Sequence, residues 1–119
     1  LQVGSDTGDV GSLPVFLHRD FELMIEAGIS PYQALRAGTY NPAQVISRIT
    51  NQPQDRGIIA AGYLADLVLL KDNPLTDISN TRNQHGVMID GHWFKSDELK
   101  TMVKHFVSLP IIPHNLDFK

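Results

Sequence analysis

The sequence predicts an α/β fold in which helices come first and short strands follow. In the first half, residues 30–31 and 41–42 each place a capping side chain before a proline, which is typical of a helix start. In the second half, two apolar runs flank Asp90 and Gly91, a pair that supplies the positive φ values of a hairpin turn. This order is unusual for a self-contained fold, so we expect a chain that leaves one domain and completes another.

The first helix is expected over residues 18–27. Its apolar side chains recur at helical spacing and share one face: Leu17, Phe21, Met24 and Ile25. Gly28 follows in the usual position of a C-terminal glycine, so we expect the helix to end there.

Two further helices are expected before residue 51. Ser30 is expected to cap the second, which continues to Gly38. Asn41 is expected to cap the third in the same way. The apolar stripe of that third helix consists of Val45, Ile46 and Ile49.

The second half is expected to hold strands and one more helix. A β-rich run at residues 65–70 ends at the polar breaker of residues 71–74, and the hairpin follows at residues 87–94. Ser96 is expected to cap the last helix, and residues 110–119 are expected to lie extended along a surface. The inward side chains of that helix are expected to be Leu99, Val103 and Phe106, with Met102 as a further candidate.

The composition is that of one ordinary globular domain, with 119 residues, 42% of them apolar and 19% charged. The net charge is −3 and no basic cluster stands out, which argues against nucleic acid as a partner. The apolar runs are far shorter than the ~20 residues of a membrane helix. There is no cysteine, which excludes thiol chemistry and disulfides. The first residue is not methionine, so we expect a piece of a longer protein, and the localisation stays open.

Three stretches together resemble the C-terminal part of the amidohydrolase superfamily, and most closely its imidazolonepropionase-like members. Residues 4–8, GSDTG, resemble the family's Gly-Ser/Thr-Asp at the end of the eighth barrel strand. Residues 18–43 are similar to the helices that follow that strand. Residues 57–70, GIIAAGYLADLVLL, resemble the signature Gly-x-Ile-x-x-Gly-x-x-Ala-Asp-Leu-Val, which is the most specific of the three because several spacings agree. The departures, such as Gly38 in place of a usual alanine, lie away from the expected metal.

The resemblance implies an α/β fold made of the C-terminal part of a (β/α)8 TIM barrel and strands of a small β-sandwich domain. Residues 1–50 would be the last strand and helices of the barrel. Residues 51–95 would be the C-terminal strands of the composite β-sandwich. Residues 96–119 would be a C-terminal helix and an extended tail.

The resemblance also implies a metal-dependent hydrolase that cleaves a C–N bond in a small-molecule substrate: a cyclic amide, an amidine or a peptide-like bond. The cofactor would be a divalent metal, expected to be zinc (one or two ions), which lowers the pKa of a bound water to about 7. Most metal ligands would lie upstream, in the rest of the protein's own chain, so we expect the isolated fragment to be inactive. A homo-oligomer is compatible with a barrel enzyme. The alternative is a non-catalytic binding or structural homologue that has lost the metal histidines.

Asp6 is the expected catalytic residue and metal ligand. It follows the apolar stub of residues 1–3, and the C-terminal end of a barrel strand is where catalytic residues gather. A carboxylate there can bind the metal, accept a proton from the attacking water and return it to the leaving nitrogen. The alternative from spacing alone is a loop aspartate that bonds its own backbone.

His18 is the expected substrate-binding residue, because the family often has a histidine where the loop enters the helix. The alternative is a histidine that bonds a helix end or solvent. The other histidines show no metal-ligand spacing and are expected to be surface or packing residues: His85, His92, His105 and His114. Asp66 is expected to be structural and to accept hydrogen bonds from backbone amides near Gly62. Trp93 is expected at a core or domain interface.

Overall fold

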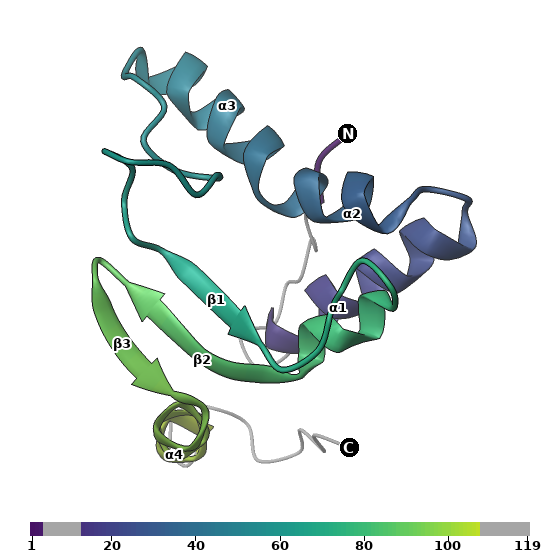
Figure 1. Cartoon of the computed structure of the whole chain (residues 1–119), viewed down its shortest axis with the longest axis vertical. Helices are drawn as coiled ribbons and strands as arrows, with labels where there is room; N and C mark the ends of the chain where they lie inside the picture. The colour runs from purple at the N-terminus through teal and green to yellow at the C-terminus, as the bar shows by residue number, and fades with distance from the viewer. Residues whose placement is uncertain (4–12, 108–119) are drawn as a thin grey trace.

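The computed structural model describes residues 1–3 and 13–107 of the chain (Figure 1). In the described part the elements follow in the order α1 (Leu13–Glu26), α2 (Pro31–Gly38), α3 (Tyr40–Thr50), β1 (Leu67–Leu70), the 3₁₀ helix η2 (Ile78–Arg82), β2 (Gln84–Ile89), β3 (His92–Lys95) and α4 (Ser96–Val107). The predicted succession of helices and then strands is therefore confirmed. None of the helices in these residues is long and apolar enough to cross a membrane.

Helix α1 begins at Leu13, earlier than the predicted residue 18, and ends at Glu26. The earlier start is compatible with Pro14, because a proline in the first helical turn removes an N–H that has no partner there anyway. The predicted end is confirmed. Gly28 has φ +85°, and the amide of Ile29 donates to the carbonyl of Met24 at 3.0 Å, which closes the helix.

Helix α2 begins with the predicted cap. The side chain of Ser30 accepts from the amide of Gln33 at 3.4 Å, and the side chain of Gln33 accepts from the amide of Ser30 at 3.2 Å. Each side chain satisfies a backbone donor of the other residue. The local sequence alone therefore decides where this helix starts.

Asn41 does not cap helix α3, so that prediction was wrong. The helix begins at Tyr40 with Thr39 as its N-cap, because α2 ends at Gly38 and runs almost directly into it. The side chain of Asn41 instead donates to the carbonyl of Leu1 at 2.6 Å. A contact between the start of the chain and α3 has replaced a local cap.

The sheet is antiparallel and has the order β1-β2-β3. The predicted hairpin is confirmed, with Asp90 at φ 48° and Gly91 at φ 76° in its turn. Strand β1 starts two residues later than predicted. Ala65 and Asp66 both accept backbone donors from the hairpin turn, so they contact the turn and do not extend the β1–β2 ladder.

The buried core lies where α1, α2 and η2 meet (Figure 1). Its buried members are Phe21, Ala34 and Ile78. A Cβ atom on Gly38 would lie 2.7 Å from the ring of Phe21. The glycine that departs from the family pattern therefore leaves room for an aromatic ring in this core.

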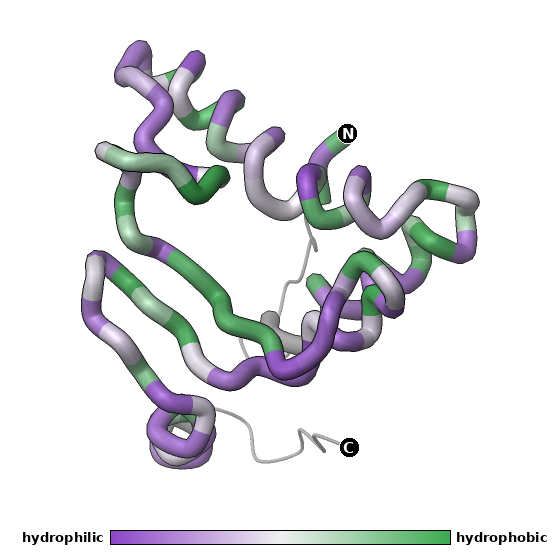
Figure 2. Tube along the Cα trace, in the orientation of Figure 1, coloured by the Kyte–Doolittle hydropathy of each residue, from purple (hydrophilic) through white to green (hydrophobic). Residues whose placement is uncertain are grey.

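Large apolar side chains are exposed on the other elements. Figure 2 shows the hydrophobic run along β1, where Val68 is 57% exposed. On α3, Ile49 is 79% exposed. On α4, Val103 is 50% exposed, so its predicted inward orientation is not found in the described part of the chain. The amphipathic pattern is present in these helices, and within the described residues α4 packs against β2 and β3 of the sheet.

Candidate functional site

Asp6 lies outside the described residues, as does His114. Its assignment as metal ligand and proton carrier therefore stays a prediction. The site that the structure does describe surrounds His18, the second predicted residue.

His18 lies within α1 and not at the entry of the helix, because α1 starts at Leu13. Its Nδ1 atom is 3.0 Å from Oγ1 of Thr81, which belongs to η2 and is buried. The hydroxyl of Thr81 donates to the carbonyl of Ile78 at 2.8 Å. A half-buried histidine of the first helix is thus bonded to a 3₁₀ helix from the second half of the chain.

The surroundings of His18 favour its neutral form. Burial lowers the pKa of His18, and the positive charge of Arg82 lowers it further. The carboxylate of Glu22 acts in the opposite direction and raises it less. Since the pKa lies below its usual value of 6.5, the imidazole is uncharged at neutral pH.

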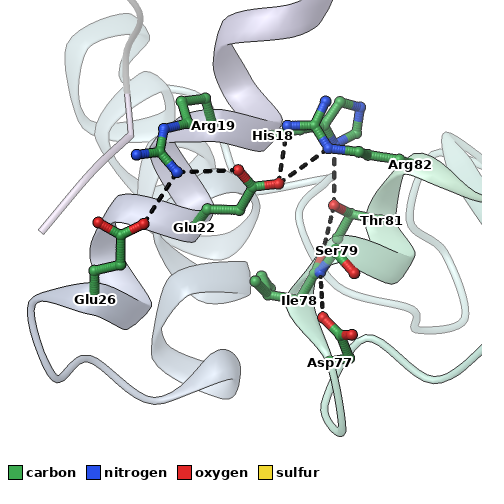
Figure 3. A network of polar contacts seen from close by, with 9 residues as sticks. All are labelled: His18, Arg19, Glu22, Glu26, Asp77, Ile78, Ser79, Thr81 and Arg82. Carbon is green, nitrogen blue, oxygen red and sulfur yellow. Dashed lines mark hydrogen bonds and ion pairs between the residues drawn. The ribbon is translucent and has the colours of Figure 1, made fainter.

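Glu22 is the centre of the ion pairs beside His18 (Figure 3). Its Oε1 accepts from Nε and Nη2 of Arg82, at 3.0 and 2.9 Å. Its Oε2 accepts from Nη1 of Arg19 at 3.3 Å, and the same nitrogen donates to Glu26 at 3.0 Å. The hydrogen bonds from Arg82 are the main reason that the pKa of Glu22 is lowered, so this carboxylate is ionised and paired.

The 3₁₀ helix η2 that carries Thr81 and Arg82 has its own cap. Oδ1 of Asp77 accepts from the amide of Ser79 at 2.9 Å. Hydrogen bonding from the side chain of Ser79, and then from its amide, lowers the pKa of Asp77. The side chain of Asn80 donates to the carbonyl of Asn73 at 3.1 Å, which connects η2 to the breaker loop after β1. Local bonds thus hold η2 in the conformation that meets His18.

Asp66 has a structural contact, but with a different partner from the one predicted. Its Oδ1 accepts from the amide of Asp90 at 2.8 Å, in the hairpin turn. The prediction of amides near Gly62 was wrong, because the residues before β1 lie against the turn between β2 and β3. Asp66 therefore connects strands that are distant in sequence.

The remaining described histidines are dispersed. The ring of His85 lies 6.5 Å from that of Trp93, and His92 is exposed, with Nδ1 3.1 Å from the carbonyl of Asp90. Trp93 covers Gly86, where a Cβ atom would lie 2.3 Å from the indole ring. Trp93 is nevertheless 39% exposed, so it is a partly covered packing residue of the sheet.

The sequence profile of the amidohydrolase family matches residues 2–94 of this chain. The chain belongs to the amidohydrolase family. Three curated relatives carry the name adenine deaminase. The protein of Listeria innocua is 32% identical over 103 residues, which are 87% of this chain and 17% of the relative. The protein of Leuconostoc mesenteroides is 34% identical over 77 residues, 65% of this chain and 12% of its own length.

The third relative, from Lysinibacillus sphaericus, is 30% identical over 98 residues, 79% of this chain and 16% of the relative. The amidohydrolase chain therefore spans between about an eighth and a sixth of the length of the curated relatives it matches. Family membership implies the TIM-barrel fold for such proteins, and the described α-helices and three-stranded sheet are compatible with part of one.

The described residues of this amidohydrolase chain do not by themselves fit a metal centre. Within residues 1–3 and 13–107, no three His, Asp or Glu side chains are grouped so that they could hold an ion. Oδ2 of Asp20 is buried without a hydrogen-bond partner, but a single carboxylate does not make a ligand set. The family's metal chemistry therefore cannot be built from the part of the chain that the structure describes.

Sequence reasoning found His18 in the amidohydrolase chain but not the residues around it. Thr81 and Arg82 lie in a segment without a motif, and Arg82 is 60 residues from its partner Glu22. The one available indication was the i, i+3 spacing of Arg19 and Glu22 on a helix, which predicts their ion pair but not the contact with η2.

Proposed function

We propose that the protein to which this chain belongs hydrolyses the C–N bond of an amidine in a small heteroaromatic substrate of the aminopurine class, and releases ammonia. The supporting observation is the similarity to three adenine deaminases, each 30–34% identical over 65–87% of this chain. The amino-bearing carbon of adenine is part of an amidine, which is one of the C–N substrates that the sequence motifs imply.

The reaction adds the oxygen of one water molecule to the carbon that carries the amino group. The C–N bond then breaks, and the amino group leaves as ammonia with one of the water protons. The other proton ends on the ring nitrogen, and the carbon becomes a carbonyl. Such a reaction needs a group that accepts a proton from water and returns it to the leaving nitrogen.

Asp6 is the residue of this chain that we propose for that task, and also as a ligand of a divalent metal, with zinc as the proposed ion. A bound divalent metal would supply an acidified water at neutral pH. The other ligands would come from the rest of the protein. Support for Asp6 comes from its position in the GSDTG stretch within the matched residues 2–94.

The change from helices to strands along the chain supports the proposed division into segments. Residues 1–50, which include α1 to α3, would belong to the barrel, and residues 51–95, which include β1 to β3, to the β-sandwich. Residues 96–119 would form the C-terminal helix and tail. His18, on α1, would then lie in the barrel part and on the substrate side.

Ammonia release from adenine by the whole purified protein tests this proposal. The assay is run with the protein as purified, after treatment with a chelator, and after zinc is added back. We expect ammonia and the corresponding oxo-purine, with loss on chelation and recovery with zinc. A metal-loaded protein that releases no ammonia from adenine or other aminopurines would contradict the proposed substrate class.

A further inference from the structure

We infer that Thr81 is a positioning residue that holds the imidazole of His18 in its Nδ1–H tautomer, so that Nε2 accepts a hydrogen bond from an N–H group of the substrate. The substrate part of this inference rests on the proposed function. The tautomer part rests on the contacts of three residues alone.

The tautomer follows from the number of hydrogens. A threonine hydroxyl has one hydrogen to donate. In this structure the hydroxyl of Thr81 donates it to the carbonyl of Ile78 at 2.8 Å, and a carbonyl can only accept. The hydroxyl of Thr81 therefore has no hydrogen left to donate to His18. The 3.0 Å contact between Thr81 Oγ1 and His18 Nδ1 is a hydrogen bond only if Nδ1 carries the hydrogen. In a neutral imidazole, the other nitrogen, Nε2, is left with a lone pair.

The charges beside the ring favour the same form. In Figure 3 the guanidinium of Arg82 lies next to His18, and its positive charge disfavours a second proton on the ring. The carboxylate of Glu22, which would favour that proton, already accepts from Arg82 and Arg19. The imidazole therefore has a fixed donor side toward Thr81 and an acceptor side on the opposite nitrogen.

The orientation of a functional histidine is commonly set by a hydrogen bond at its other nitrogen. Thr81 is only 7% exposed and belongs to a capped 3₁₀ helix, so the bond acts on a rigid support. A neutral Nε2 accepts from donors, and the amino and ring N–H groups of an aminopurine are donors.

Nuclear magnetic resonance of the whole protein with ¹⁵N-labelled histidine tests the tautomer directly. His18→Gln identifies the resonances. We expect the wild-type ring to show a protonated Nδ1 and an unprotonated Nε2. Thr81→Val keeps the shape of the side chain without the hydroxyl, and should move the ring toward Nε2–H, whereas Thr81→Ser should keep the wild-type pattern.

Thr101→Val is the matched control, because the hydroxyl of Thr101 also donates to a carbonyl in its own helix, that of Asp97 at 2.9 Å, on α4. It should leave the His18 resonances unchanged. A wild-type ring with Nε2–H, or a Thr81→Val ring that keeps Nδ1–H, would overturn the inference. The wild-type spectrum by itself shows which nitrogen of His18 carries the hydrogen, even if the valine variant does not fold.

Steady-state kinetics with adenine tests the use of Nε2. Thr81→Val should raise KM about 3- to 10-fold, the effect of losing one neutral hydrogen bond, with a smaller change in kcat, and Thr81→Ser should restore the wild-type KM. A shifted tautomer with unchanged KM would overturn the acceptor role. If the wild-type protein releases no ammonia from adenine, the proposed function fails, but the acceptor role of Nε2 is still tested by binding. A chemical shift of His18 Nε2 that does not change when excess adenine is added would overturn that role.

Discussion

The junction of α1 with η2 and the sheet with α4 are held together in different ways. At the junction, Phe21 is 5% exposed, and Arg82 bonds a glutamate 60 residues earlier in the chain. In the sheet, a tight turn joins β2 to β3, whereas β1 comes from earlier in the chain, and its apolar residues Val68 and Leu69 are more than half exposed. The first region has a tertiary core of its own. In the second, backbone pairing between strands sets the structure while much apolar surface stays uncovered, so substitutions should act differently in the two.

The largest expected effect is on turnover, and it separates two aspartates. Substitution of Asp6, in the proposed site, should reduce turnover strongly, whereas substitution of Asp66, beside the sheet, should leave it nearly unchanged. In the whole protein, Asp6→Ala should lower turnover by at least 10²- to 10⁴-fold, the cost of losing a general base, while the fold is kept. Activity and zinc content are measured together with circular dichroism. Near-normal turnover with zinc retained would remove Asp6 from the site.

A large effect on stability is expected from the core of the junction. Phe21→Ala should lower the free energy of unfolding by about 3–5 kcal/mol, because it removes a buried ring and leaves a cavity. Ile49→Ala, at a position 79% exposed in this chain, is the comparison, and should cost less than about 1 kcal/mol if the position stays exposed in the whole protein. Urea unfolding of both variants measures the difference. An equal loss for both would mean that α3 has a buried partner elsewhere in the protein.

A smaller effect is expected at the hairpin turn. Asp66→Asn should lower the free energy of unfolding by about 1 kcal/mol, because it weakens a charge-assisted bond to the amide of Asp90 at an exposed site. Turnover per folded molecule should be nearly unchanged. The exposed Asp72→Asn is the control for loss of charge alone. A large fall in turnover at an unchanged melting temperature would place Asp66 in the catalytic machinery.

The smallest effect is expected from pH. Burial and Arg82 lower the pKa of His18 in the folded state, so between this lowered value and 6.5 the unfolded chain binds more protons. Stability should therefore fall as pH falls through this window. His18→Gln should remove that slope, whereas His92→Gln, at an exposed ring, should keep it. Urea unfolding of the three proteins at several values between about pH 5 and about pH 8 measures the slopes. A slope that persists in His18→Gln would assign the titration to another group.

The sequence by itself determined the features that depend on neighbouring residues. The cap at Ser30, the end of α1 at Gly28 and the turn at Asp90 all lie where their patterns predicted. Each results from the φ preference of one residue or from a bond between residues three positions apart, so no distant contact is needed. The family resemblance could also be found from the sequence, because it depends only on the identity and spacing of residues along the chain.

Only the tertiary structure decided which side chains leave their local partners for distant ones. Asn41 bonds the carbonyl of Leu1 in place of capping its own helix, and Asp66 bonds a turn that lies 24 residues further along. The partner of His18 could not be predicted either, since Thr81 is 63 residues away and carries no motif. A polar side chain can satisfy its hydrogen bonds with any group that the fold brings near, and for His18 that choice depends on the packing of α1 against η2.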